Sequence, residues 1–101
     1  MAKLTKVAET SDIPPGEGRV IEAEGKTLAV FNVDGTFYAV DNTCLHRGGP
    51  LGEGELDGRI VTCPWHGWQY DVSTGQNAMN PAVKVLSYPV KVESGAVFVE
   101  L

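Results

Sequence analysis

The placement of the few metal-binding residues constrains this chain more than any other feature. The sequence has two cysteines and two histidines, and they form two short motifs, Cys44-x-His46 and Cys63-x₂-His66. Each motif follows a β-rich run, because FYAVDNT leads into Cys44 and GRIVT leads into Cys63. The fold must therefore deliver one thiolate and one imidazole at the end of each of two strands, in two loops that face each other.

Ligands one or three residues apart converge on one site only where the backbone curls around it. Gly48, Gly49 and Gly67 permit such a curl, and they also let amide groups approach an anionic centre closely. Two thiolates with two imidazoles suit zinc, or an iron–sulfur cluster in which two histidines replace two cysteines on one iron. Zinc sites more often pair like residues, so alternating Cys and His favours a two-iron site to which each loop gives one ligand per iron.

Three other interpretations of these residues compete with the cluster. A Cys44–Cys63 disulfide leaves both histidines unexplained and does not fit a reducing cytosol. Four unrelated residues would have to fall into two matched loops by chance. A structural zinc site in the same four residues is the strongest alternative.

The remaining pattern has a period of two residues, which predicts strands. Asp34-Gly35 and Ser94-Gly95 each separate two such runs, as in tight hairpins. The segment 11–18, SDIPPGEG, is predicted to be a loop, and no amphipathic helix of about ten residues is expected. The predicted fold class is all-β, an antiparallel β-sandwich or partly open barrel. The predicted strands are Leu4–Ala8, Arg19–Ala23, Leu28–Val33, Thr36–Val40, Arg59–Thr62, Tyr88–Val92 and Val97–Leu101.

Length and charge limit the class of protein. The 101 residues predict a single domain over 1–101. A net charge of −5 disfavours nucleic acid and an anionic membrane as partners, and favours a partner protein with a basic patch. The first residues, MAKLTKVAETSD, have no apolar signal-peptide region, so a cytoplasmic location is expected.

The two Cys/His motifs and the residues around them resemble those of a known family. CLHRGGPLG and CPWHGWQYD closely match the two cluster-binding motifs of Rieske [2Fe–2S] proteins, C-x-H and C-P-x-H-G-x. Further similarity lies in GELDGRIVT, in Asp71–Gly75 and in the L-x-Y-P-V-K-V run over 86–92.

The resemblance implies a Rieske fold with a small cluster-binding subdomain of two loops, roughly 42–71, and one [2Fe–2S] cluster. Cys44 and Cys63 would bind one iron, and His46 and His66 would bind the outer iron. Pro81 would belong to a third loop, near 80–82, that covers the cluster.

Departures within the motifs indicate which kind of Rieske protein this is. Gly49 and Trp65 stand where the proteins of respiratory cytochrome bc complexes have a disulfide. Trp68 stands where those proteins have a serine that donates to a bridging sulfide. Loss of that donor predicts a potential near the low end of the Rieske range, which spans about −150 to +300 mV. Tyr70 either keeps a hydroxyl near a ligand sulfur or is a strand residue with a half-buried ring.

The two tryptophans also have two interpretations. Trp65 and Trp68 either pack under the loops and hold them without a disulfide, or one of them lies at the surface beside His66 in a docking patch. Leu45 and Arg47 flank His46 and are candidates for the same patch, although Arg47 is equally explained as a solvated loop charge.

The cluster uses both histidines, and no residues remain for a mononuclear iron, a nucleophile–base pair or a dinucleotide site. The chain is therefore predicted to be an electron carrier and not an enzyme. The favoured function is a ferredoxin that passes electrons from an NAD(P)H-dependent reductase to a terminal oxygenase of the aromatic-ring-hydroxylating type. The alternatives are a small subunit of an assimilatory nitrite reductase and a zinc-stabilised structural or binding module.

Overall fold

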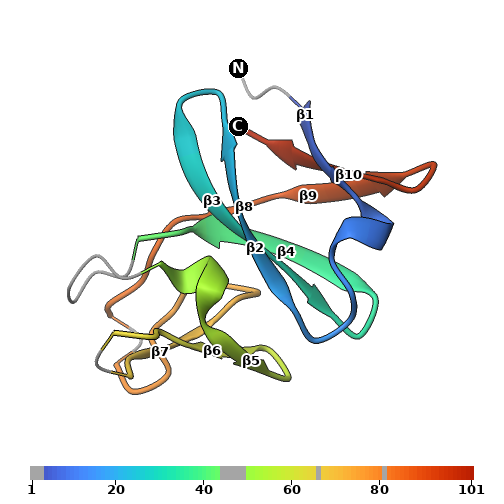
Figure 1. Ribbon diagram of the computed structural model, residues 1–101. Coiled ribbons are helices and arrows are strands. Elements are labelled where there is room, and N and C mark those ends of the chain that lie inside the picture. Colours follow the sequence, from blue (N-terminus) through green and yellow to red (C-terminus); the bar gives the residue numbers. More distant parts are fainter. Residues whose placement is uncertain (1–3, 44–49, 66, 81) are drawn as a thin grey trace.

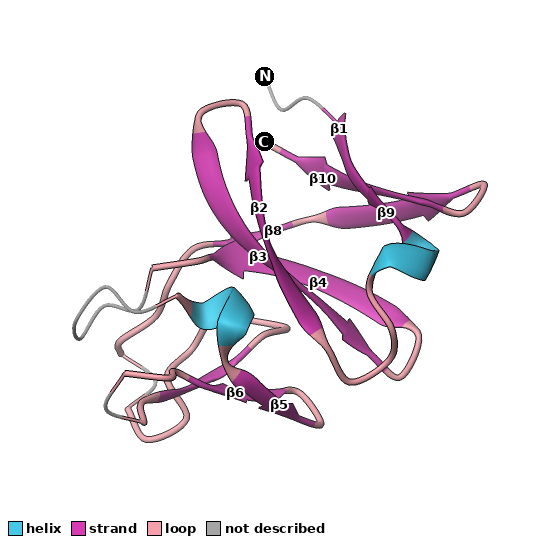
Figure 2. Cartoon of the chain, in the orientation of Figure 1, coloured by secondary structure: helices cyan, strands magenta, loops and turns pink. Residues whose placement is uncertain are grey.

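The computed structural model describes residues 4–43, 50–65, 67–80 and 82–101. Ten strands and two 3₁₀ turns make up the regular structure of these residues. Figures 1 and 2 show how these elements are arranged. The strands are β1 (Leu4–Glu9), β2 (Gly18–Ala23), β3 (Lys26–Val33), β4 (Thr36–Asp41), β5 (Glu55–Asp57), β6 (Ile60–Thr62), β7 (Gln69–Asp71), β8 (Ser87–Tyr88), β9 (Val90–Glu93) and β10 (Ala96–Glu100). The turns are η1 (Thr10–Asp12) and η2 (Leu51–Glu53).

The strands form three antiparallel sheets, which confirms the predicted all-β class. A terminal sheet has the order β1-β10-β9, a central sheet the order β2-β3-β4-β8, and a small sheet the order β5-β6-β7. In Figure 1 the small sheet lies below the central sheet, and the terminal sheet lies on the other side. The central sheet is therefore the middle layer of the molecule.

Two-residue turns set the register of the central and terminal sheets. Asp34 and Gly35 have φ of 52° and 94°, so both occupy the left-handed region that a type I′ turn requires. Ser94 and Gly95 do the same between β9 and β10. Both predicted hairpins are confirmed, and a third such turn, at Glu24-Gly25, joins β2 to β3.

Each face of β3 contributes to a different core. Its four central residues, 28–31, are fully buried, so this strand is covered on both sides. We call the two clusters of buried residues the upper core and the lower core. The upper core, between the central and terminal sheets, contains Ile13, Leu28, Val30, Phe37, Ala39, Val97 and Val99. The lower core, between the central sheet and the small sheet, contains Ala29, Phe31, Val40, Leu51, Val61, Cys63, Tyr70, Val72 and Val85.

The segment 11–18 differs from the predicted loop at two points. It begins inside η1, and Ile13 is fully buried in the upper core. The buried Asn32 side chain donates to the Ile13 carbonyl at 2.8 Å and accepts from the Gly35 amide at 2.8 Å. A partnered asparagine thus holds an apolar residue inside a segment that its prolines and glycines predict to lie at the surface.

Candidate metal centre

The second predicted ligand loop is a short hairpin at the end of the small sheet. Thr62 pairs with Gln69 at the ends of β6 and β7, and the Cys63 amide donates to the Trp68 carbonyl at 2.7 Å. Gly67 has φ of +76°, so the chain reverses there through a conformation that glycine adopts without strain. The loop therefore presents Cys63 at its base, where the paired strands fix the position of the residue. His66 lies outside the described residues.

Cys63 belongs to the lower core. Its side chain is only 1% exposed, and it shares the core with Val61 and Tyr70. A cysteine at the base of this loop, buried in an apolar core, fits the donor chemistry of an iron–sulfur cluster, because thiolate ligands suit such clusters and an apolar surround limits solvent access.

The first predicted ligand loop leaves β4 and returns in η2, and both of its ends are described. Thr43 and Pro50 form an antiparallel bridge, so the loop closes on itself at its base. Leu51, the first residue of η2, is fully buried in the same core as Cys63. The two loops are therefore anchored to one core, as a shared metal site requires. Six predicted residues lie outside the described residues: Cys44, Leu45, His46, Arg47, Gly48 and Gly49.

The two tryptophans occupy different environments. Trp68 is partly buried and packs against the lower core, whereas Trp65 is 50% exposed. The interpretation in which both tryptophans pack beneath the loops thus fits only Trp68. Trp65 lies at the surface of the second loop, as a docking residue would.

Tyr70 is fully buried in the lower core. Tyr70 lies in β7, as the predicted alternative had it, but its ring is fully buried and not half-buried. Its ring packs in the core that contains Cys63, and the proposed bond from its hydroxyl to a ligand sulfur stays a prediction.

Residues 77–80, together with Val83, lie beside the second loop. Asn77 bridges Tyr70, and the Ala78 amide donates to the Gln69 carbonyl at 2.8 Å. The Asn77 side chain accepts from the Met79 and Asn80 amides at 2.8 and 3.0 Å and so bends the chain. A cavity of about 480 Å³ separates these residues from the loop, lined by Gly67, Trp68, Gln69, Asn77, Met79, Asn80 and Val83. Pro81 lies outside the described residues, and Asn80 lines the cavity together with Gly67 and Trp68.

Sequence reasoning did not identify Met79, which is 88% exposed. A lone methionine between alanine and asparagine has no periodicity that would mark it as a surface residue.

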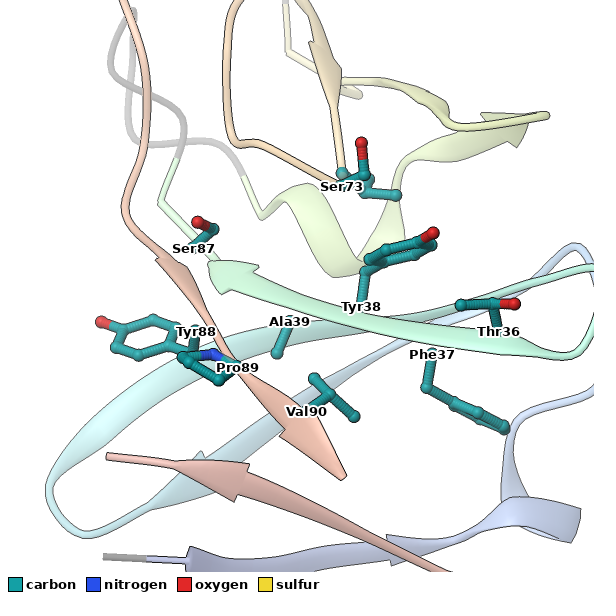
Figure 3. Close-up of a pocket in the computed structure, with 10 residues that line it drawn as sticks. Thr36, Phe37, Tyr38, Ala39, Ser73, Ser87, Tyr88, Pro89 and Val90 are labelled. Atoms are coloured by element: carbon teal, nitrogen blue, oxygen red, sulfur yellow. The ribbon is translucent and has the colours of Figure 1, made fainter. Parts of the chain in front are cut away.

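A second cavity, of about 460 Å³, lies between β4, β8 and the turn after β7 (Figure 3). Tyr38 points from one face of β4 toward Ser73, while Phe37 and Ala39 point from the other face toward the side of Val90. No cysteine or histidine is among the described residues that line this cavity.

Tyr88, at the edge of that cavity, links β8 to the end of β4. Its hydroxyl donates to Asp41 Oδ1 at 2.6 Å, and Lys26 Nζ lies 5.9 Å from the centre of its ring. Burial, together with the hydrogen bond and the negative charge of Asp41, raises the pKa of Tyr88 from 10.0 to about 12. The phenol therefore stays neutral at ordinary pH and holds the strand end from which the first ligand loop departs.

We expect this pKa shift to make folding stability fall between pH 10 and pH 12. Above pH 10 the unfolded chain releases the Tyr88 proton while the folded chain keeps it, so rising pH favours the unfolded state. Denaturant unfolding across this range should show a shallower decline for Tyr88→Phe. Tyr38→Phe removes a phenol but leaves the Asp41 bond intact, so it should decline like the wild type. Parallel curves for Tyr88→Phe and wild type would contradict the linkage.

Comparisons with known proteins agree with this geometry. The family model of the Rieske [2Fe–2S] domain matches residues 3–90. The chain is 37% identical over 100 residues to the ferredoxin component of the naphthalene 1,2-dioxygenase system of Pseudomonas putida, covering 98% of this chain and 96% of the relative. It is 41% identical over 96 residues to the ferredoxin CarAc of Metapseudomonas resinovorans, covering 93% and 90%.

Solved structures share the fold. A ferredoxin of Sphingomonas yanoikuyae B1 has a TM-score of 0.89 at 33% identity, covering 98% of this chain and 99% of that chain. A chain from the complex of reduced oxygenase and oxidised ferredoxin in carbazole 1,9a-dioxygenase has 0.87 at 39%, covering 96% and 92%. A putative NADH-dependent nitrite reductase small subunit from Mycobacterium tuberculosis has 0.91 at 25%, covering 100% and 96%.

No helix in the described ranges is long and apolar enough to cross a membrane. The matched family confirms the predicted fold and favours the [2Fe–2S] cluster over zinc. The chain belongs to the Rieske [2Fe–2S] domain family, as a ferredoxin that carries electrons and does not itself catalyse a reaction.

Proposed function

We propose that this chain carries single electrons from an NAD(P)H-dependent reductase to a terminal oxygenase of the ring-hydroxylating type, in the cytoplasm. The observation that carries the proposal is the near end-to-end similarity to ferredoxin components of dioxygenase systems. A ferredoxin chain found together with an oxygenase supports the choice of that partner. The site agrees, because it fixes Cys63 at a loop base beside a dry core.

Four residues would hold the cluster, with Cys44 and Cys63 on one iron and His46 and His66 on the other. The bound cluster supplies a reversible one-electron redox centre. The part of the chain in the lower core, including Trp68, excludes water from the Cys63 side of the site. Water exclusion and the fixed position of Cys63 would limit the rearrangement of the protein when the cluster gains or loses an electron.

Charge and exposed apolar surface would guide the partner to the site. Two thiolates and an oxidised cluster core cancel, so the net charge stays near the formal −5, and reduction adds one negative charge. Such a charge attracts a basic docking patch and speeds encounter at low salt. Trp65, with Leu45 and Arg47 as candidates beside His46, would supply the contact surface.

Anaerobic purification followed by visible and EPR spectra tests the proposal directly. A reduced-state EPR signal whose average g lies below the free-electron value indicates mixed Cys/His ligation. The same preparation should transfer electrons to a ring-hydroxylating oxygenase in stopped-flow mixing, and rising salt should slow the transfer through screening. A colourless zinc protein would overturn the proposal.

The alternative function, a small subunit of a nitrite reductase, is supported by a solved structure of similar fold. Its sequence identity to this chain, 25%, is lower than that of the dioxygenase ferredoxins. Small subunits of this kind resemble Rieske domains, and many of them lack cluster ligands. This chain keeps all four ligand residues, which supports the ferredoxin. Transfer to the oxygenase, compared with transfer to a sirohaem reductase, separates the two functions.

We expect Trp65→Ala to slow electron transfer to the oxygenase by about tenfold without changing the EPR signal. An exposed aromatic side chain contributes much of the binding energy when it is buried at an interface. The matched control is Val92→Ala, which removes a side chain of similar exposure, 48%, from β9 in the terminal sheet. Equal transfer rates for the two variants, measured by stopped-flow mixing, would remove Trp65 from the docking surface.

A further inference from the structure

Asn42 stands where β4 ends and the first ligand loop begins, and it bonds in three directions. Its backbone amide donates to the Thr27 carbonyl on β3 at 3.2 Å, and its carbonyl accepts from the Leu51 amide at 2.7 Å. Its side-chain Oδ1 accepts from the Gly52 amide at 2.8 Å. The residue is only 8% exposed. One buried asparagine therefore joins the outgoing end of the loop, the returning end of the loop and the central sheet.

The returning end of the loop packs closely against its neighbours at two glycines, Gly52 within η2 and Gly54 directly after it. A Cβ on Gly52 would lie 2.8 Å from Val20 Cγ2 and 2.9 Å from the Arg19 carbonyl oxygen, so η2 packs directly on β2. A Cβ on Gly54 would overlap the carbonyl oxygen of Thr62, the residue before Cys63. The turn that Asn42 holds is thus pressed against β2 on one side and against the strand that delivers Cys63 on the other.

These contacts form a continuous path from one ligand loop to the other. Asn42 fixes η2, and η2 meets Thr62 through Gly54, next to the base of the second loop. A shift of η2 therefore changes the position of one loop base relative to the other. A buried polar group with several strong bonds is suited to this task, because leaving its partners unsatisfied costs free energy.

We infer that Asn42 is a positioning residue that sets the first ligand loop relative to the second and thereby tunes the iron–sulfur cluster. The inference rests on the proposed function, since it takes the cluster to lie between the two loops. Asn42 touches no cluster atom in this account and acts through the loop ends that it joins. Outer residues of this kind orient metal ligands and affect metal affinity.

The test compares holoprotein variants by EPR, by reduction potential and by the rate of cluster loss under an iron chelator. Asn42→Ala removes the bond to the Gly52 amide, so its g values and potential should shift, and cluster loss should be about tenfold faster or more. Asn42→Asp keeps an acceptor oxygen and should restore the g values and the chelator rate. Asn42→Ser, with a shorter side chain, should change both measurements in the direction of alanine by a smaller amount, and it replaces the alanine variant if that variant does not fold.

Asn32→Ala is the matched control. Asn32 is also a buried asparagine with two side-chain bonds, to Ile13 and Gly35, but it lies at the opposite end of β3. Its loss should lower the unfolding midpoint and leave the EPR signal, the potential and the chelator rate unchanged.

The outcomes separate the inference from the proposed function. A wild-type protein without the Rieske signal would overturn the proposed function and the inference with it. A wild-type signal that Asn42→Ala and Asn42→Ser leave unchanged would overturn the inference alone. Equal spectral and chelator effects from Asn32→Ala would also overturn it, because the effect would then reflect global stability.

Discussion

Replacing Gly75 with alanine is expected to lower the free energy of unfolding by about 2–4 kcal/mol. Gly75 has φ of +84°, and its amide donates to the Asp71 carbonyl at 2.7 Å while its carbonyl accepts from the Val85 amide at 2.9 Å. A Cβ there would overlap the Val85 carbonyl oxygen. Alanine at this position is therefore strained by its positive φ. Its methyl group also displaces the backbone of Val85, a residue that belongs to the lower core with Cys63.

Gly16→Ala separates these two effects. Gly16 has nearly the same φ, +85°, but a Cβ on it would have no neighbour within 4 Å. Gly16→Ala should therefore lower the free energy of unfolding only by the cost of the positive φ, about 1 kcal/mol. Denaturant unfolding of the two holoprotein variants measures the difference. Equal losses would mean that the close approach of Val85 to Gly75 contributes nothing.

The sequence predicts the central and terminal sheets well because their signals are local. Asp34-Gly35 and Ser94-Gly95 are residue pairs that accept positive φ, and each lies between alternating runs long enough to show a period of two. Glu24-Gly25 forms the same kind of turn but was not predicted, because glutamate rarely takes up the left-handed conformation. The strands β5 and β7 were not among the predicted strands, because three residues are too few to reveal a period and neither has the adjacent β-branched residues that marked the equally short β6.

The sequence predicts the type of residues in the candidate site, but it does not predict the packing and hydrogen bonds that hold them in place. Residue type and spacing predict that Cys63 is a ligand and that it lies in a loop. That Cys63 is also a core residue follows from the packing of the small sheet on β3, a contact between segments far apart in the chain. Asn42 has no local signal either, because an asparagine after a strand resembles any turn residue until its bond to Gly52 is seen.

Removing the cluster is expected to loosen the lower core and leave the upper core intact. Neither loop has the disulfide of the cytochrome bc proteins, since Gly49 and Trp65 occupy those positions. The cluster would therefore add a link between the two loops beyond the packing of η2 against Thr62, and its binding free energy would stabilise the fold around it. Cys63 lies in the lower core, whereas the upper core is built from the other faces of β3 and β4 together with the terminal sheet.

Hydrogen exchange on holoprotein and apoprotein measures this difference. Amides of β6 and β7, and the Cys63 amide bonded to Trp68, should lose protection in the apoprotein. Amides of Val30, Ala39 and Val97, in strands that line the upper core, should keep theirs. Cys63→Ser should give the apoprotein pattern without chelator, because it removes a ligand from the set of four.

Val99→Ala provides the reverse case. Val99 is fully buried in the upper core, so the cavity left by its truncation destabilises the terminal sheet while every cluster ligand remains. Exchange should then rise in β9 and β10, and the visible spectrum of the cluster should persist. If cluster removal instead loosens both cores equally, β3 must transmit the loss through its shared backbone, and the two cores would be one cooperative unit.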